Sequence, residues 1–516
     1  MLTNLDSLVQ IYCGPVFNLP FPAAGSTLMS VEAPVWWTIV ATVALGGSLR
    51  ATIDVGPDGP VLVDAVRVGG EVPTSSGEVE ILDATGNLIA TAGIPDPRWR
   101  TIVGHEGEGT GAKLEYARIR VDVPWPDHAA SIRLGAQQLR PTDRRAPPPG
   151  NAVAVSKNGP SSERLDLVFL GDGYRQSELD TFADDVDWIV DYLREIEPYG
   201  SYSGMLNIWR IDAASSESGV SHDETGLSRD TEYDCYYGCL GIDRLVCCDD
   251  TKVMDAVEAA VPGADGVMVL INDPVYGGSG GFNYATSYTG SADGRQVAAH
   301  ELGHSLVGLW DEYTYPYSGS GEGPNCSSSS SGSWDEWYGR QEVTAYRECS
   351  YPGLYRPTER SCMMNSLLDD YCPVCRQETI YAMYAHLPSL FSSIDPAPGP
   401  LDTSAGKVSF EVVTNGPDDG LVHEWTLDGK VISSDPNLKL SCTKGEGELM
   451  LRVYDDTAWV RADPYDLMSE TAGPWTITVD GECDESIFAA CNCNATPHPA
   501  QAGWLLVLAL LVRRRR

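Results

Sequence analysis

The sequence predicts a multidomain protein in which a central α/β domain lies between two antiparallel β domains. With 516 residues, the chain is too long for one hydrophobic core. Two proline-rich segments, 140–150 and 395–400, divide it into three parts. Between them, strand-like and helix-like apolar patterns alternate, whereas the flanking parts show the period-two alternation of half-buried strands. The predicted division is 1–50, 51–145, 150–395, 401–482 and 483–516.

Residues 1–50 are predicted to be a leader or signal segment. A 13-residue apolar run, 35–47, follows Met29 and has the length of the apolar core of an export signal. Glu32 precedes the run without a Lys or Arg, which departs from the usual signal pattern. The run also suits a buried strand that opens the next domain, so both interpretations stay open.

Residues 51–145 predict a small antiparallel β domain. Segments 77–83 and 117–123 alternate apolar and polar residues, and the turn signal Pro57-Asp58-Gly59 lies upstream of them. This part of the chain carries no chemical motif.

The central segment, 150–395, reads as α/β. Strands are predicted at 165–170, 206–211 and 266–271. One helix follows Ser177 as its cap, and a second helix begins at Thr251. The first helix has apolar residues at helical spacing, namely Phe182, Val186, Ile189, Val190, Leu193 and Ile196. Such alternation predicts right-handed βαβ units.

Residues 401–482 resemble an immunoglobulin-like β-sandwich. Four segments repeat the strand pattern, at 407–413, 422–427, 448–453 and 475–479.

The last segment, 483–516, is predicted to be a linker and a sorting tail. Cys491-Asn-Cys493 precedes an 11-residue apolar run, 502–512, and four arginines follow the run. As a helix the run would be about 16 Å long, half of the ~30 Å hydrocarbon core of a bilayer. This order resembles the MYXO-CTERM tails of exported myxobacterial proteins. The resemblance implies export, loss of the tail, and a cell-surface, outer-membrane or extracellular location; a frayed amphipathic end is the alternative.

The net charge of the chain limits the classes of macromolecule that it can bind. The chain has 35 Lys+Arg against 73 Asp+Glu, a formal net charge of −38. Phosphate backbones would be repelled, which excludes nucleic-acid binding through a general basic face. Attachment to a membrane or cell surface would depend on the carboxy-terminal tail, and the sequence leaves the oligomeric state open.

The chain has 14 cysteines, nine of them between Cys235 and Cys375, which predicts disulfides formed in an oxidising compartment. Cys372-Pro-Val-Cys375 also suits half of a structural zinc site. The comparable half would have to be the adjacent pair Cys247-Cys248, which lacks the usual spacing.

The segment His300-Glu301-Leu302-Gly303-His304 carries the chemistry. Apolar residues around it continue a helical pattern, and two imidazoles four residues apart on a helix can hold one metal ion. Glu301 then lies near the ion and can act as a general base. Zinc suits this role, because it lowers the pKa of a bound water to about 7. We therefore predict His300 and His304 as ligands of one catalytic Zn²⁺ and Glu301 as the catalytic base.

A catalytic zinc needs a third protein ligand. Gly308 can end the helix in a left-handed conformation, which lets Asp311 turn back to the ion, with Glu312 as a second choice. Metzincins place their third ligand in this way, but their glycine and ligand each come one residue earlier. Ligands from elsewhere in the sequence stay open, namely Glu322, Glu336, Glu342, His222 and His386.

Cys362-Met363-Met364-Asn365 follows about 60 residues after the helix. Metzincins place a methionine turn beneath the zinc, and Met364 or Met363 would fill that role here; a plain core methionine pair is the alternative. Tyr371 is a candidate for stabilising an oxyanion.

The glycine-rich segment Gly278-Ser279-Gly280-Gly281 precedes the helix. It lacks the Lys-Ser/Thr of a phosphate loop and suits an edge along which an extended peptide could pair. A flexible surface turn is the alternative.

Several motifs together resemble the immunoglobulin-A-peptidase family of zinc metallopeptidases over about 150–395. They include Leu170-Gly-Asp-Gly-Tyr174, Asn207-Ile-Trp209, Ser218-Gly-Val220 and the run from His300 to Tyr313. The resemblance implies an α/β metzincin-like zinc peptidase domain, with His300, His304 and Asp311 as ligands and Glu301 as base. It does not imply that an antibody is the substrate.

We therefore predict a secreted or surface-attached zinc-dependent endopeptidase acting on a protein or peptide substrate. The alternative is an adhesion or binding protein in which the β domains matter most and the metal site is structural or inactive. Calcium is a further candidate ion because carboxylates are abundant, but the sequence has no EF-hand loop.

Overall fold

The computed structural model describes residues 48–479 apart from 57–58, 69–78, 93–98, 101–111, 114–116, 125–127, 135–136, 141, 144–151, 282, 315–321, 331–333, 388, 403–406, 418–419, 442–444 and 462–466. All of these residues belong to one compact unit of the chain. The predicted apolar run at 35–47 and the predicted tail at 483–516 lie outside the described residues. Within the described residues strands predominate over helices, so the protein is β-rich with several separate sheets.

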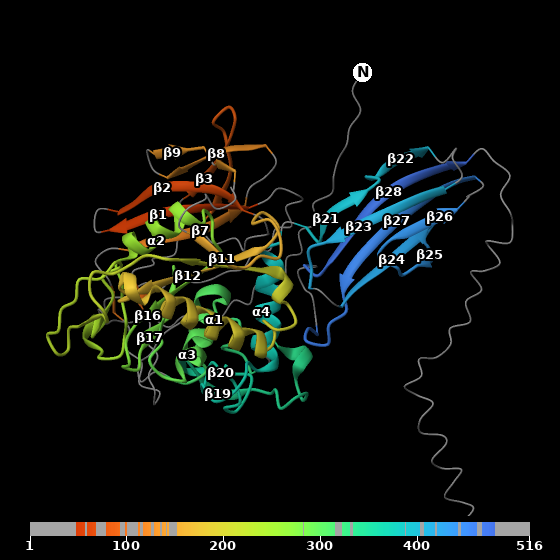
Figure 1. Ribbon diagram of the computed structural model, residues 1–516. Coiled ribbons are helices and arrows are strands. Elements are labelled where there is room, and N and C mark those ends of the chain that lie inside the picture. The colour runs from red at the N-terminus through yellow and green to blue at the C-terminus, as the bar shows by residue number, and fades with distance from the viewer. Residues whose placement is uncertain are drawn as a thin grey trace, which may run out of the picture. The chain divides into compact units, whose positions relative to one another are not determined.

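A six-stranded mixed sheet forms the centre of the chain (Figure 1). Its order is β11 (Ala152–Ser156), β13 (Leu206–Ile211), β12 (Leu165–Asp172), β16 (Gly266–Ile271), β18 (Ala285–Tyr288) and β17 (Gly278–Ser279). The four inner strands are parallel, and the two outer strands are antiparallel to their neighbours. The predicted strands at 206–211 and 266–271 have these bounds, and the strand predicted at 165–170 extends to Asp172.

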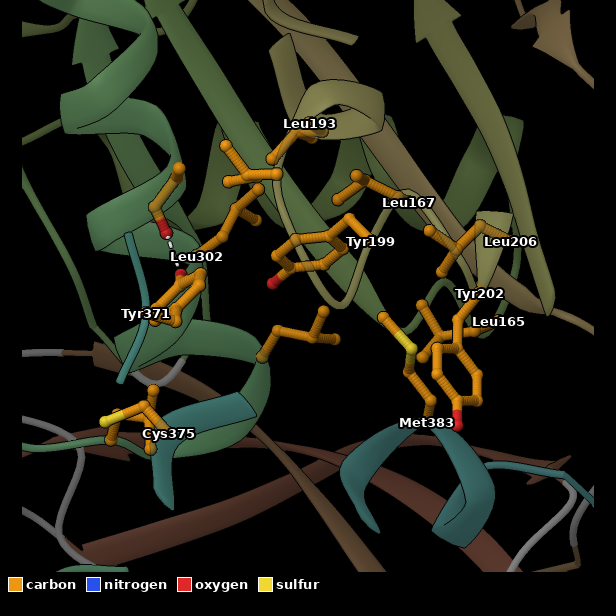
Figure 2. Close-up of a cluster of buried hydrophobic side chains, with 14 of the residues drawn as sticks. Leu165, Leu167, Leu193, Tyr199, Tyr202, Leu206, Leu302, Tyr371, Cys375 and Met383 are labelled. Carbon is orange, nitrogen blue, oxygen red and sulfur yellow. Dashed lines mark hydrogen bonds between the residues drawn. The ribbon is translucent and has the colours of Figure 1, made fainter. Parts of the chain in front are cut away.

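Both faces of this sheet are buried, because side chains of successive residues point to opposite cores. In β12, Leu167 and Phe169 contribute to one core, while Val168 and Leu170 contribute to the other. The first core contains residues from α1 (Leu179–Glu195), α3 (Gly294–Leu302) and α4 (Pro373–Ala385), as Figure 2 shows in part. The second core contains residues of α2 (Asp250–Ala260). This layering places α3, which carries the histidine motif, directly on the sheet.

The helix predicted after Ser177 is α1, and its predicted apolar residues are buried. Ser177 is not its cap. It lies within the 3₁₀ turn η1 (Gln176–Glu178), where the carboxylate of Glu178 reaches back to accept from the backbone N–H of Arg175 at 2.8 Å. The start of α2 also differs from the prediction, because Asp249 caps it by accepting from the N–H groups of Thr251 and Lys252.

The amino-terminal part contains two four-stranded sheets and one strand pair. The first sheet has the order β10 (Thr142–Asp143), β2 (Gly59–Val68), β1 (Ser48–Gly56) and β7 (Ala117–Pro124). The second has the order β4 (Leu88–Ala92), β3 (Val79–Asp83), β8 (Ala129–Leu134) and β9 (Gln137–Leu139), and β5 (Trp99–Arg100) pairs with β6 (Ala112–Lys113).

The carboxy-terminal part contains two sheets that share one core. The smaller sheet has the order β21 (Phe391–Asp395), β23 (Lys407–Thr414) and β26 (Leu438–Ser441). The larger has the order β22 (Gly399–Asp402), β28 (Ser469–Val479), β27 (Gly445–Asp455), β24 (Leu421–Leu427) and β25 (Lys430–Ser433). Phe410, Trp425 and Trp475 pack between them with ring centroids 5.2–5.6 Å apart. The immunoglobulin type of this pair of sheets, and the boundaries of the domains, stay predictions.

Short elements complete the described chain. Two strand pairs are β14 (Ser221–His222) with β15 (Tyr236–Tyr237), and β19 (Tyr346–Cys349) with β20 (Tyr351–Arg356). The 3₁₀ turns η2 (Ser203–Met205), η3 (Cys239–Gly241) and η5 (Asp335–Trp337) and the π-helical turn η4 (Gly303–Val307) are the others.

The predicted disulfides are present among the described cysteines. They join Cys235 to Cys248, Cys239 to Cys247, and Cys326 to Cys349. Cys247 and Cys248 are therefore not half of a zinc site. Cys362, Cys372 and Cys375 are buried free thiols.

Within the described residues, a search for helices that combine sufficient length with sufficient apolar character to cross a membrane finds none.

Candidate metal centre

The histidine motif begins in α3 and continues into the π-helical turn η4, which ends at Gly308. Gly308 has φ +77°, and this left-handed conformation is one that glycine adopts without steric cost. The predicted helix stop is thus confirmed. A π turn accommodates one residue more than the regular α-helix. It therefore explains how Gly308 and Asp311 can each come one residue later than in metzincins and still return the carboxylate to the histidines.

Both imidazoles are oriented by backbone carbonyls. His300 Nδ1 lies 2.9 Å from the carbonyl oxygen of Met363, and His304 Nδ1 lies 2.7 Å from that of Leu309. A ring that donates through Nδ1 leaves Nε2 free as a lone-pair ligand. The two Nε2 atoms lie 3.2 Å apart, with the ring planes at 85°. The pair is therefore arranged to share one ion.

Asp311 supplies the third potential ligand atom. Its Oδ1 lies 3.2 Å from His300 Nε2 and 3.3 Å from His304 Nε2. Ligands held about 2.0–2.1 Å from zinc at tetrahedral angles are about 3.3 Å apart, so the triangle has the expected size. The structure thus brings together the three residues that the sequence suggested as ligands, His300, His304 and Asp311.

Glu301 lies beside this triangle and is only 2% exposed. Its Oε2 is buried, and no hydrogen-bond partner for it is found in the part of the chain that the structure describes. A buried carboxylate oxygen without a partner is costly. A water molecule held between this oxygen and a metal ion would remove that cost.

The electrostatics of the site favour a positive charge inside the triangle. Burial opposes the charged form of His304, but the Asp311 carboxylate outweighs it and raises the pKa of His304 to about 9. Burial likewise disfavours the charged form of Asp311, yet the two imidazoles hold the pKa of Asp311 well below its usual range. Burial raises the pKa of Glu301, and the histidines oppose this rise. A divalent cation inside the triangle would balance the same buried carboxylate charge of Asp311.

Both predicted methionines lie beneath the motif, and both are fully buried. The carbonyl of Met363 orients His300, as described above. The sulfur of Met364 lies 2.9 Å from the position that a Cβ on Gly303 would occupy, so the helix approaches the methionine closely only because Gly303 has no side chain. Tyr371, the candidate for an oxyanion, instead donates its hydroxyl to the carbonyl of Ala299 in the buried cluster of Figure 2.

The glycine-rich segment lies against the other side of the motif. A Cβ on Gly280 would be 2.7 Å from His304 Cβ and 2.8 Å from Glu301 Oε2. Gly278 and Ser279 form the outermost strand, but Gly278 also bridges to Leu245, and Ser279 Oγ donates to the carbonyl of Val246. The backbone of Gly278 is therefore already paired on its outer side. Gly280 is the part of the predicted substrate edge that lies next to Glu301.

The other predicted ligands lie elsewhere. Glu312 does not reach the histidines, because its buried carboxylate lies among Asn325, Cys372 and Cys375. Among the remaining alternatives, Glu322 accepts from Ser328, and Glu336 and Glu342 are exposed. His222 hydrogen-bonds to Glu224 and Asp273. His386 lies near Asp265.

Sequence reasoning missed the two glycines that make the site possible. Gly303 and Gly280 are each pressed against side chains of the centre, which no motif signals. Their positions, one inside the histidine motif and one in a glycine-rich segment, were the only available hints.

Zinc fits this donor set. Two neutral imidazoles and one carboxylate form a three-ligand catalytic site with an open position.

A search among curated proteins returns no significant match to this chain. Among solved structures, fibronectin(III)-like modules of Clostridium thermocellum CbhA match 18% of this chain and 94% of their own length, with 18% identity and a TM-score of 0.13. At that TM-score the likeness does not establish a shared fold.

Residues 153–328 match the family described as IgA Peptidase M64. The matched range includes the histidine motif, Glu301 and Asp311, and it ends before the methionine pair. The members of that family are metallopeptidases. The match therefore supports the immunoglobulin-A-peptidase family for this chain, and with it a metallopeptidase.

Proposed function

We propose that this chain is a zinc-dependent endopeptidase that acts outside the cytoplasm on protein or peptide substrates. One observation carries the proposal: three ligand atoms 3.2–3.3 Å apart lie beside Glu301, whose buried oxygen lacks a partner within the described chain. The family match supports the peptidase class.

His300, His304 and Asp311 would hold the ion. When bound, zinc supplies Lewis-acid polarisation of a carbonyl and makes a water molecule more acidic. Glu301 accepts the proton of that water at its carboxylate and then delivers the proton to the leaving amine. Burial raises the pKa of Glu301 above its ordinary value, so the carboxyl group binds a proton more readily than a solvent-exposed one.

The substrate would lie extended along Gly280 and Gly281. Gly280 is packed directly against Glu301 and His304, since an added Cβ would lie 2.8 Å from Glu301 Oε2 and 2.7 Å from His304 Cβ, so this segment borders the centre. The strongly acidic chain, with a net charge of −38, favours neutral or basic substrates through long-range attraction.

Export rests on two features. Three disulfides lie in the described chain, which suits an oxidising compartment. The cysteine, apolar run and terminal arginines at 491–516 resemble a sorting tail, which would attach the protein to the cell surface or be removed.

The test is hydrolysis of a peptide library by the purified full chain, with and without a chelator. Glu301→Gln keeps the shape of the side chain and should retain zinc while losing at least ~100-fold in hydrolysis, the usual size of a general-base contribution. Glu336→Gln, an exposed glutamate, is the matched control and should hydrolyse at the wild-type rate. Equal rates for Glu301→Gln and wild type, or hydrolysis that survives chelation, would remove the mechanism.

A further inference from the structure

A second group of ligand-type side chains lies outside the histidine site. Glu312, Cys362, Cys372 and Cys375 are all buried, and one ligand atom from each lies within 4.8 Å of every other. They come from three segments: the residue after Asp311, the residue before Met363, and the start of α4. The proposed peptidase chemistry uses none of these side chains.

The separations between these atoms match tetrahedral coordination. Cys362 Sγ lies 3.6 Å from Cys375 Sγ, and Glu312 Oε1 lies 3.3 Å from Cys375 Sγ and 3.8 Å from Cys372 Sγ. Zinc bonds of about 2.3 Å to sulfur and about 2.1 Å to oxygen place neighbouring ligands about 3.5–3.8 Å apart at tetrahedral angles. The cluster therefore has room for one ion at its centre.

The backbone around the cysteines is arranged to stabilise thiolates. Cys372 caps α4, and its Sγ accepts from the backbone N–H of Cys375 at 3.4 Å. The N–H of Cys372 in turn donates to Cys362 Sγ at 3.4 Å. The amino terminus of α4 adds a favourable dipole for negative charge. The two-residue spacing of Cys372 and Cys375 is also the usual spacing of a zinc-binding cysteine pair.

The composition of the cluster favours a metal over a disulfide. Six cysteines of the described chain form three disulfides, and the thiols of Cys362, Cys372 and Cys375 remain. A disulfide between any two of these thiols would leave the third thiol without a partner. Glu312 has no exposed surface, and its hydrogen-bonding neighbours Asn325 and Thr358, at 3.2 and 3.4 Å, are uncharged. Arg356 attracts it through space, and a metal ion held by the cluster would add a direct cationic partner for the buried carboxylate.

We propose that Glu312, Cys362, Cys372 and Cys375 bind a second zinc ion in a closed, structural site. Soft thiolate ligands select zinc, and four protein ligands leave no open position for catalysis. The sequence had offered only Cys372 and Cys375 as half of such a site. The structure supplies the other half from Cys362 and Glu312.

The second site would hold in place the segments that carry Asp311 and the methionine pair beside the catalytic centre. The N–H of Glu312 donates to the carbonyl of Met364 at 2.8 Å, and the carbonyl of Met363 orients His300 at 2.9 Å. An ion that ties Glu312 to Cys362 therefore fixes both the segment that carries Asp311 and the methionine segment. This proposal does not depend on peptidase activity.

Metal analysis of the full chain, purified without chelator, tests the proposal. Wild type should contain about two zinc ions per chain, and the His300→Ala/His304→Ala double variant about one. Cys372→Ser/Cys375→Ser should lose the other ion. The matched control, Cys239→Ser/Cys247→Ser, removes a disulfide instead and should keep about two.

Cobalt substitution identifies the ligands even if the cysteine variant does not fold. The His300→Ala/His304→Ala variant loaded with Co²⁺ should still show sulfur-to-cobalt charge-transfer absorption and the visible bands of tetrahedral cobalt. A His300→Ala/His304→Ala variant that binds no zinc, a cobalt-loaded variant without the sulfur band, or a disulfide among Cys362, Cys372 and Cys375 by mass spectrometry would each overturn the proposal. Failure of hydrolysis with two zinc ions bound would count against the peptidase mechanism and leave this site standing.

Discussion

The carboxylate of Asp311 completes the catalytic triangle while being only 3% exposed. Its Oδ1 lies between two Nε2 atoms whose rings are fixed by backbone carbonyls. Because the histidines cannot rotate away without breaking those bonds, an ion held by them would be positioned by the carboxylate that faces them.

We expect Asp311→Asn to weaken zinc binding at this site at least ~10-fold, because the amide keeps the shape but removes the charge that balances the cation. Hydrolysis should fall with it. The measurement is zinc affinity by competition with a chelating dye, alongside peptide hydrolysis. Asp335→Asn, at an exposed position, is the control. Full activity in Asp311→Asn would move the third ligand elsewhere.

A substitution of Gly280 tests how the close contact of the glycine-rich segment with the metal centre affects activity. Gly280→Ala would place a methyl group 2.7–2.8 Å from His304 Cβ and Glu301 Oε2, closer than van der Waals contact allows. We expect kcat/KM to fall at least ~10-fold, since the productive geometry tolerates little displacement. In Gly159→Ala, the atoms nearest to the added methyl, at 3.1–3.2 Å, belong to the side chain of Arg164 rather than to the centre, and activity should be kept. Unchanged kinetics in Gly280→Ala would separate this segment from the substrate.

At the scale of elements, the join between α3 and η4 decides where the ligands lie. The helix and its end at Gly308 could be predicted from apolar spacing and from the conformational freedom of glycine. The π turn could not, because it depends on how α3 packs rather than on local sequence. The extra residue that made Asp311 uncertain in the sequence is the residue that the π turn absorbs.

The helix α4 also carries a carboxyl group with a pH-dependent effect on stability. Burial raises the pKa of Glu378 from 4.5 to about 7. Between these values the unfolded chain has already released its proton while the folded chain still holds it, so stability falls as pH rises from about 4.5 to about 7.

Glu378→Gln removes this titration. Thermal unfolding should show similar midpoints for variant and wild type at about pH 4, and a more stable variant at about pH 8, by up to about 3 kcal/mol. Glu336→Gln, an exposed glutamate, should show no such divergence. A variant that tracks wild type across the whole range would contradict the raised pKa.

The helix caps show a different limit of sequence reasoning. Ser177 was a reasonable cap by residue type, but it lies within the 3₁₀ turn before α1, and the second helix, predicted to begin at Thr251, begins at Asp250 with Asp249 as its cap. Several neighbouring residues can cap a helix, and the packing of the first turn chooses among them. Boundaries therefore shifted by one or two residues, while the helices themselves were predictable.

At the scale of the molecule, the metal centre joins segments that are far apart in the sequence. Gly280, His300, Asp311 and Met364 meet around one point. The histidine motif and the methionine pair could be predicted because their spacing carries the chemistry. The link from Cys362 and Cys375 to Glu312 could not, because no local pattern relates residues 50 or more positions apart.

Metal removal should therefore loosen the molecule as well as stop hydrolysis. A ligand that binds only the folded state stabilises it by mass action, so a chelator should lower the unfolding midpoint by several degrees, and added zinc should restore it. Differential scanning calorimetry measures this. The His300→Ala/His304→Ala variant should show a smaller drop, because only the second ion remains to be lost. A chelator without effect on the midpoint would argue against ions in the folded chain.

Anomalous X-ray diffraction from crystals of the zinc-loaded protein, collected on both sides of the zinc absorption edge, shows whether an ion lies between the histidines and Asp311. We expect an anomalous peak about 2.0–2.2 Å from His300 Nε2, His304 Nε2 and Asp311 Oδ1, next to Glu301. A map without density at that point, or with a peak bound by the histidines while Asp311 faces away, would contradict this expectation.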